Sequence, residues 1–263
     1  MLFRSTHMAL IDDLEAEVAA LDSVVSALED SDWETQTPAP GWRVAEQVAH
    51  LVIFDERCKW GIADPDRFTR DLESIRTSGG FAAVESGYVA LGPAQLRSTW
   101  IDGAAELRDA GRRADPKARC QWYGPSMSAT SMLTARLMET WAHGYDICDA
   151  IGVTPVATDR LRHVAHIGVN ARAFAYAANK MTMPDVPVRV ELTGPSGQTW
   201  TWGPEADNVV RGDALGFCLA ATQRRHVSDC GLETTGDAAH EWMSIVQAFA
   251  GPPGEGRQPG QFG

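Results

Sequence analysis

The segment METWAHGYD, residues 138–146, carries Glu139, His143 and Asp146 at helical spacing. A helix advances about 100° per residue, so these side chains and Arg136 project from one side. Glu and His four residues apart can reach one metal ion, and a carboxylate with an imidazole suits zinc or another divalent cation. Such pairs are also common on solvated helix faces, so the segment alone leaves both interpretations open.

A third ligand is available from His50, which lies in VAEQVAHLVIF on the apolar side of a second predicted helix. In a helical bundle, facing helices supply ligands to one site in the core. The residues alone favour the simpler alternative, a buried histidine bonded to a neighbouring polar group. Glu46 lies four residues before His50 and could be a ligand, a hydrogen-bond partner of His50, or an exposed carboxylate.

Apolar residues at helical spacing predict the long helices that would hold these side chains. Four are expected, over residues 7–30, 42–64, 93–113 and 128–152. Ser126 or Ser128 could cap the last of them, and Gly152 would end it. The stretch near residues 77–80 is polar and contains glycine, and we expect it to be a connection. This order predicts a four-helix bundle.

The second part of the chain has a different pattern. A linker containing Pro155 leads to a fifth predicted helix over residues 159–180. Two strands are expected around a Gly-Pro-Ser-Gly turn, with Val188, Val190 and Leu192 alternating on the first strand. Two more helices and an irregular tail complete the prediction: residues 212–225, 237–251 and 251–263. The predicted fold class is α+β, with a helical domain over residues 1–152 and a small α/β domain over residues 153–263.

Two separated segments resemble a known family. APGWRVAEQVAHL and RLMETWAHGYDICDAIG together resemble the N-terminal domain of the mycothiol-dependent maleylpyruvate isomerase family, a branch of the DinB-like metal-binding bundles. The family pattern is a Pro-Gly-Trp loop, a helix with His before Leu, and a later helix with R-x2-E-x3-H-x2-D. The resemblance implies that His50, Glu139 and His143 bind one divalent metal, most often zinc, and that Glu46 is not a ligand.

The resemblance also implies an activity. Three protein ligands leave one position of a tetrahedral site open, which is the catalytic arrangement. In the family this position takes the thiol of mycothiol, and metal coordination turns a thiol into a nucleophile at neutral pH. The implied function is a metal-dependent, mycothiol-using thiol transferase or isomerase that acts on a small electrophilic metabolite. The substrate itself is not specified by any residue pattern.

Three further residues are candidates near this site. Asp146 could orient His143, or it could form a salt bridge on the helix surface. Arg136 could hold an anionic group of cofactor or substrate, or it could pack its stem and pair with a carboxylate. Trp42 could contact the cofactor, or it could pack against the core where its helix begins.

Residues 159–250 resemble more loosely the C-terminal domain of the same family, a sterol-carrier-like α/β layer. In the family this domain offers an arginine to a substrate carboxylate. Arg224 is the candidate that we take for this catalytic role, with Arg225 and Arg172 as alternatives. A surface role is the simpler interpretation of each of these arginines.

Composition limits the function further. The formal net charge of −12 disfavours a nucleic-acid partner, which usually needs a basic face, and leaves a small, possibly anionic substrate as the expected partner. Five cysteines, an odd number without a CxxC pair, favour a reducing cytoplasm over a disulfide framework. The sequence has no signal-peptide pattern and no apolar run long enough to span a membrane.

The competing function is a non-catalytic, metal-containing protein that binds a small ligand in its second domain. That protein would close its metal site with a fourth protein ligand. Glu46 and Asp146 are the residues that could supply this ligand. The oligomeric state is not specified by the sequence.

Overall fold

The computed structural model describes residues 2–77 and 80–262. The chain divides into two compact units, one ending at Pro155 and the other beginning at Val156. The first unit is helical, and the second is a small mixed sheet with helices, so the fold class is α+β. In the described part of the chain, no helix has both the length and the apolar character needed to span a membrane.

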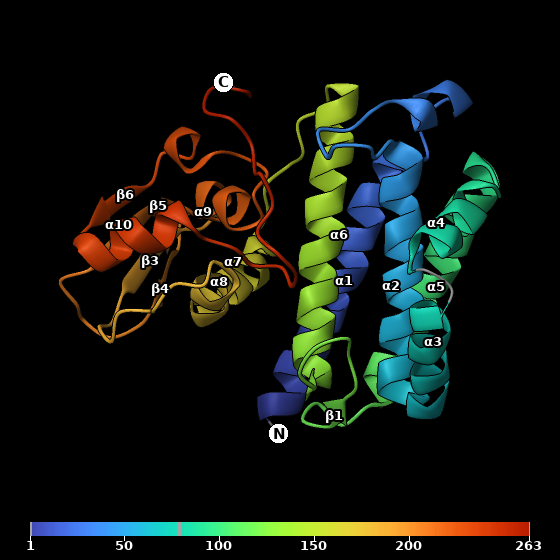
Figure 1. Ribbon diagram of the computed structural model, residues 1–263, viewed down its shortest axis with the longest axis horizontal. Helices are drawn as coiled ribbons and strands as arrows, with labels where there is room; N and C mark the ends of the chain where they lie inside the picture. The colour runs from blue at the N-terminus through green and yellow to red at the C-terminus, as the bar shows by residue number, and fades with distance from the viewer. Residues whose placement is uncertain (1, 78–79, 263) are drawn as a thin grey trace. The chain divides into compact units, whose positions relative to one another are not determined.

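Four long helices form the body of the first unit and lie side by side in Figure 1. They are α1 (Leu2–Val25), α2 (Val44–Ala63), α5 (Pro93–Arg113) and α6 (Ala129–Ile151). Helix α2 packs against α5 and α6, and α1 packs against the same two helices. These are the four helices that the apolar spacing predicts, with ends that differ by a few residues.

Both ends of α6 are fixed by local chemistry that the sequence predicts. The hydroxyl of Ser128 accepts a hydrogen bond from the backbone N–H of Ser131 at 3.0 Å, which caps the first turn. Gly152 follows the last turn in the left-handed conformation, with φ of 71°, where glycine carries no steric penalty. Helix α6 is therefore continuous between its two caps, and Glu139 and His143 project from the same side of it.

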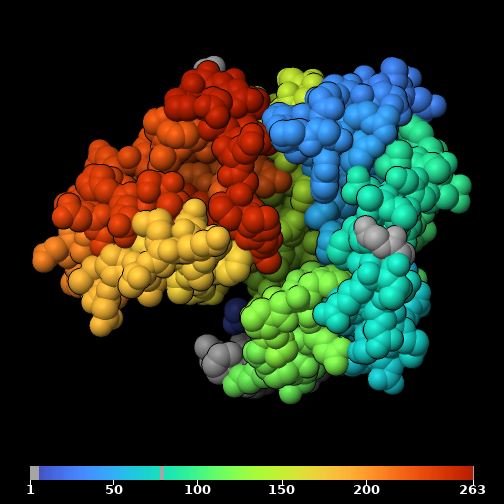
Figure 2. Space-filling view, viewed as in Figure 1, coloured from blue at the N-terminus to red at the C-terminus, as the bar shows by residue number. Residues whose placement is uncertain are grey.

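Shorter elements join these helices. They are the 3-10 helix η1 (Asp30–Glu34), α3 (Pro65–Thr77), α4 (Ala82–Val89), and the antiparallel pair β1 (Arg119–Cys120) and β2 (Met127–Ser128). Helices α3 and α4 were not predicted, because α3 buries only Phe68 and Ile75 and α4 buries no side chain. Residues 78 and 79 of the predicted polar connection lie outside the described residues. In Figure 2, η1 and the loop after it, blue at the top of the view, cover one end of the helices.

The second unit contains a four-stranded sheet in the order β4-β3-β5-β6. Its strands are β3 (Arg189–Thr193), β4 (Thr199–Trp202), β5 (Val209–Asp213) and β6 (Glu233–Thr235). The predicted hairpin is β3–β4, in which Leu192 pairs with Trp200. Strand β5 runs parallel to β3, and β6 is antiparallel to β5; neither was predicted.

Helices of the second unit are α7 (Leu161–Asn170), α8 (Arg172–Ala178), α9 (Ala214–Ala221) and α10 (Asp237–Ser244), with the 3-10 helix η2 (Val227–Asp229). The single helix predicted over residues 159–180 is interrupted at Ala171, between α7 and α8. Val190 and Leu192 on the sheet are fully buried, as are Phe217 on α9 and Trp242 on α10. The core of this unit therefore lies between the sheet and its helices.

Candidate metal centre

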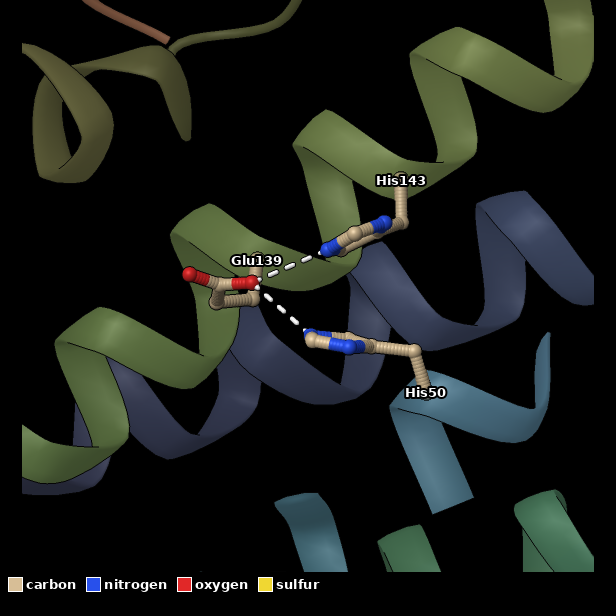
Figure 3. Close-up of side chains that lie close together, drawn as sticks. All are labelled: His50, Glu139 and His143. Atoms are coloured by element: carbon tan, nitrogen blue, oxygen red, sulfur yellow. Dashed lines mark hydrogen bonds and ion pairs between the residues drawn. The ribbon is translucent and has the colours of Figure 1, made fainter. Parts of the chain in front are cut away.

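His50, Glu139 and His143 converge in the first unit. Each offers one ligand atom, and the three atoms lie within 4.8 Å of one another. One carboxylate oxygen, Oε2 of Glu139, lies 3.3 Å from Nε2 of His50 and 3.0 Å from Nε2 of His143 (Figure 3). Within residues 2–77 and 80–262, this is the one group of three or more His, Cys, Asp and Glu side chains with this geometry.

Two facing helices bring the three residues together. Glu139 and His143 are one turn apart on α6, and His50 comes from the neighbouring α2 (Figure 3). The residues alone favoured a buried histidine at position 50, bonded to a neighbouring polar group. His50 is half-buried, and the polar group that it contacts is the carboxylate of the predicted site.

Two of the three side chains have the protonation states that a metal ion requires. Burial and the neighbouring His143 lower the pKa of His50 to about 3, so its imidazole is neutral near pH 7. Burial alone would raise the pKa of Glu139, but its contacts with the imidazoles of His143 and His50 outweigh burial and hold that pKa well below its usual value. A neutral imidazole and an ionised carboxylate are ready to ligate without losing a proton.

The donor set fits a divalent cation. Two imidazole nitrogens and one carboxylate oxygen are among the ligand combinations that catalytic zinc sites use, and they leave a position open. Glu46 is not part of the group: its carboxylate accepts hydrogen bonds from the backbone N–H and the guanidinium of Arg43. This placement agrees with the mapping implied by the family resemblance.

Aromatic rings flank the two imidazoles. The indole of Trp42 is stacked on His143, with ring centroids 5.7 Å apart and an interplanar angle of 18°. The same indole lies 5.2 Å from the ring of His50, and Phe54 lies 4.5 Å from His50 on α2. Trp42 is half-buried at the start of α2, so its ring contacts both candidate ligands and does not only pack against the core.

Arg136 is buried in an ion pair. Its Nε donates to Oδ1 of Asp55 at 2.8 Å, and the side chains of Arg136 and Asp55 are 3% and 2% exposed. The sequence offered two roles for Arg136, and this is the second of them, pairing with a carboxylate. The arginine expected to hold an anionic group of substrate or cofactor has its charge neutralised inside the helical unit.

Asp146 is also buried, at 1% exposure, so the surface salt bridge expected as an alternative does not describe it. The ring nitrogens of His143 have other partners: Nδ1 lies 2.5 Å from Oε1 of Gln47, and Nε2 faces Glu139. The contact at Nδ1 that would orient His143, one of the two roles open to Asp146, is made by Gln47, which no sequence motif singled out. The one feature of the sequence that pointed to Gln47 was its position on the same predicted helix as His50, three residues before it.

The candidate arginines of the second unit make local contacts there. The guanidinium of Arg224 donates to the carbonyl of Thr222 at 2.7 Å, just after α9. Arg225 donates to the carbonyl of Arg224 at 2.7 Å, and Arg172 donates to the carbonyl of Val186 at 2.9 Å. These bonds do not select one of the three for a role toward substrate, so the assignment of Arg224 remains a prediction.

The five cysteines are all free and buried. Burial raises the pKa of the Cys148 and Cys230 thiols to about 11, and it also raises the pKa values of Cys58, Cys120 and Cys218. The thiolate is the nucleophilic form of cysteine. No thiol of this chain is therefore prepared for nucleophilic chemistry near pH 7.

Comparison with known proteins places the candidate metal centre within a family domain. Residues 14–148, more than half of the chain, match the mycothiol maleylpyruvate isomerase N-terminal domain. The chain belongs to this family. Two proteins of Mycobacterium tuberculosis are each 43% identical to it over 252 residues, which is 94% of this chain and 97% of the relative. They are the uncharacterized proteins MT0041 of strain CDC 1551 and Rv0036c of strain H37Rv.

Two crystal structures of mycothiol-dependent maleylpyruvate isomerase share the fold, and one of them is a histidine-to-alanine mutant. The mutant matches with a TM-score of 0.54 at 17% identity, and the other structure with a TM-score of 0.53 at 16% identity. Each match covers 88% of this chain and 92% of the solved chain. At this identity the likeness concerns the fold, and it extends over both units.

Proposed function

We propose that this protein is a metal-dependent enzyme that uses mycothiol as a thiol co-substrate to transform a small electrophilic metabolite, as a transferase or an isomerase. The observation that carries this proposal is the convergence of His50, Glu139 and His143 within 4.8 Å, inside the segment that belongs to the family. The family and the solved isomerases that share the fold are both named for mycothiol, which makes it the first co-substrate to test.

The three side chains would hold the cation, and zinc is the first choice for two imidazoles and a carboxylate. A bound divalent cation would supply Lewis acidity that stabilises a thiolate at neutral pH. The chain's own residues would prepare the site. Glu139 provides the negative charge, His50 is neutral near pH 7, and the rings of Trp42 and Phe54 pack beside His50.

A thiol from outside the chain agrees with the state of the cysteines. All five are buried with raised pKa values, so a nucleophilic sulfur would have to come from a co-substrate. Five free thiols also fit the reducing cytoplasm that the sequence predicts.

The finer fold assignment belongs to the same proposal. We assign the helical unit to the DinB-like bundles, on the packing of α1, α2, α5 and α6. We assign the second unit to the sterol-carrier-like domains, on its four-stranded sheet and flanking helices. In this proposal the second unit contributes to binding of the small substrate, with Arg224 as the candidate contact to a carboxylate.

The first experiment measures metal content. Purified protein should contain near-stoichiometric divalent metal by elemental mass spectrometry, and a His50→Ala, His143→Ala double variant should contain none. A His240→Ala variant is the matched control, because His240 is exposed and its ring bonds the carbonyl of Gly236 at the start of its own helix. Absence of metal from the wild-type protein, even after zinc or cobalt is supplied, would end the proposal.

The second experiment separates an enzyme from a binding protein with a closed metal site. Cobalt-loaded protein is titrated with mycothiol, and a sulfur-to-cobalt charge-transfer band is expected if a coordination position is open. Glutathione serves as the comparison thiol. A cobalt spectrum that no thiol changes would favour the closed, non-catalytic site and would point to a fourth protein ligand.

A further inference from the structure

The contact between His143 and Gln47 has a consequence for the metal site proposed above, and it applies only if that site binds a metal. The two ring nitrogens of His143 face opposite partners. Nε2 points to Glu139 and the ring of His50, whereas Nδ1 lies 2.5 Å from Oε1 of Gln47. Gln47 is fully buried on α2, one turn before His50.

A third residue fixes the direction of the Gln47 amide. Nε2 of Gln47 donates to the hydroxyl of Thr37 at 2.8 Å, and that hydroxyl donates to the carbonyl of Trp42 at 2.7 Å. A threonine hydroxyl has one hydrogen, so Thr37 acts as acceptor toward Gln47. The amide oxygen of Gln47 is thereby turned toward His143, where it accepts the hydrogen of Nδ1. An imidazole that carries its hydrogen on Nδ1 has its lone pair on Nε2, at the metal position.

The loop that carries Thr37 is itself held in place. Thr37 N–H and the side chain of Gln36 both donate to the Trp42 carbonyl, at 2.8 Å and 2.7 Å. Gly41 turns the chain with φ of 78°, a conformation that other residues rarely adopt. The hydrogen-bond chain therefore ends on Trp42, the same residue whose indole is stacked on His143. Trp42 of this loop therefore packs on the ring face of His143. Thr37 of the same loop orients Gln47, which contacts Nδ1 of His143.

We propose that Gln47 and Thr37 are positioning residues of the metal centre: through the chain Thr37–Gln47–His143 they hold the His143 ring and keep its Nε2 lone pair directed at the metal. Partners of this kind on the outer nitrogen of a ligating histidine commonly affect metal affinity about 10- to 100-fold. The partner here is a neutral amide. Glu139 is the one carboxylate in the group of potential ligands, so a bound cation would keep more of its positive charge than it would beside a second carboxylate.

The alternative is that Gln47 and Thr37 only satisfy buried polar groups of the helical unit. Both interpretations predict some loss of stability when a partner is removed, so stability cannot distinguish them. Metal affinity and the cobalt spectrum can, because a purely structural pair would leave both unchanged. Conservative variants provide the rescue: Thr37→Ser keeps the hydroxyl, and Gln47→Glu keeps an oxygen that accepts from Nδ1.

The experiment measures zinc affinity by competition with a chromogenic chelator, and the d–d spectrum of the cobalt form, for five variants. Gln47→Leu should weaken zinc binding about 10- to 100-fold, and Thr37→Val should weaken it by a smaller factor. Thr37→Ser should bind zinc with nearly wild-type affinity. Gln47→Glu keeps an acceptor for Nδ1 but loses the N–H that bonds Thr37, so it should bind zinc more tightly than Gln47→Leu. Thr134→Val is the matched control and should bind as the wild type does. Its hydroxyl is buried on α6 and bonds the carbonyl of Thr130 in the preceding turn.

The outcomes separate the two proposals. Wild-type zinc affinity and an unchanged cobalt spectrum in both Gln47→Leu and Thr37→Val would overturn the inference and leave the metal site intact. A weakening in Thr37→Ser equal to that in Thr37→Val would also overturn it, because the hydroxyl would then not be the active group. A wild-type protein that binds no metal would instead refute the proposed function, and the inference with it.

Discussion

The buried ion pair between Asp55 and Arg136 makes the stability of the helical unit sensitive to one substitution. Replacing Asp55 with Leu removes the carboxylate 2.8 Å from Arg136 Nε and leaves a guanidinium that is 3% exposed without its counter-charge. Nη2 of Arg136 already lacks a hydrogen-bond partner, and the charge of Glu139 would then be the main one left to offset the guanidinium. Breaking a buried pair from one side costs about 3–5 kcal/mol. That is a large share of the roughly 5–15 kcal/mol that stabilises a typical domain.

The double variant Asp55→Leu, Arg136→Met should lose far less, because it removes both charges and fills the space with apolar atoms. Urea unfolding of the metal-free protein provides the measurement, with the midpoint falling and the slope unchanged. Asp22→Leu is the surface control: its pair with Arg97 has side chains 26% and 39% exposed, and its loss should cost less than about 1 kcal/mol. A single Asp55→Leu variant that is as stable as the double variant would refute the reasoning.

Two further predictions concern protonation and thiol reactivity. His50 has its pKa lowered from 6.5 to about 3, so between these pH values the unfolded chain binds a proton that the folded protein does not. The stability of the metal-free protein should therefore fall as the pH drops below about 6.5, and His50→Ala should flatten that dependence in urea titrations at several pH values. A slope that is the same in both proteins would contradict the lowered pKa. Native protein should react slowly with a thiol reagent such as DTNB at pH 7.5, and all five cysteines should react quickly in urea, because burial raises every thiol pKa. Fast reaction of one native thiol would show that this cysteine is accessible.

Much of the candidate site follows from local sequence. The spacing of Glu139 and His143 places them one turn apart on any helix. In the structure this helix lies between Ser128 and Gly152, and both capping residues belong to the same local segment of sequence. The four long helices of the first unit follow from apolar spacing in the same way, and the β3–β4 hairpin follows from its alternation and turn. The elements that were missed are those with weak local patterns. Helix α3 buries two side chains, and β5 and β6 become strands through pairing within the sheet.

The sequence by itself determined the four long helices of the first unit, the caps of α6 and the residue types that can ligate a metal. These are properties of neighbours within one turn or one strand. Tertiary packing decided which distant residues meet. Gln47 reaches His143 across 96 positions, and Asp55 reaches Arg136 across 81. These long-range pairs form because α2 packs against α6, and no local sequence pattern predicts that packing. The same packing removes Asp146 from solvent and commits Arg136 to Asp55, so the chemical role of each side chain depends on the burial and the partner that the fold provides.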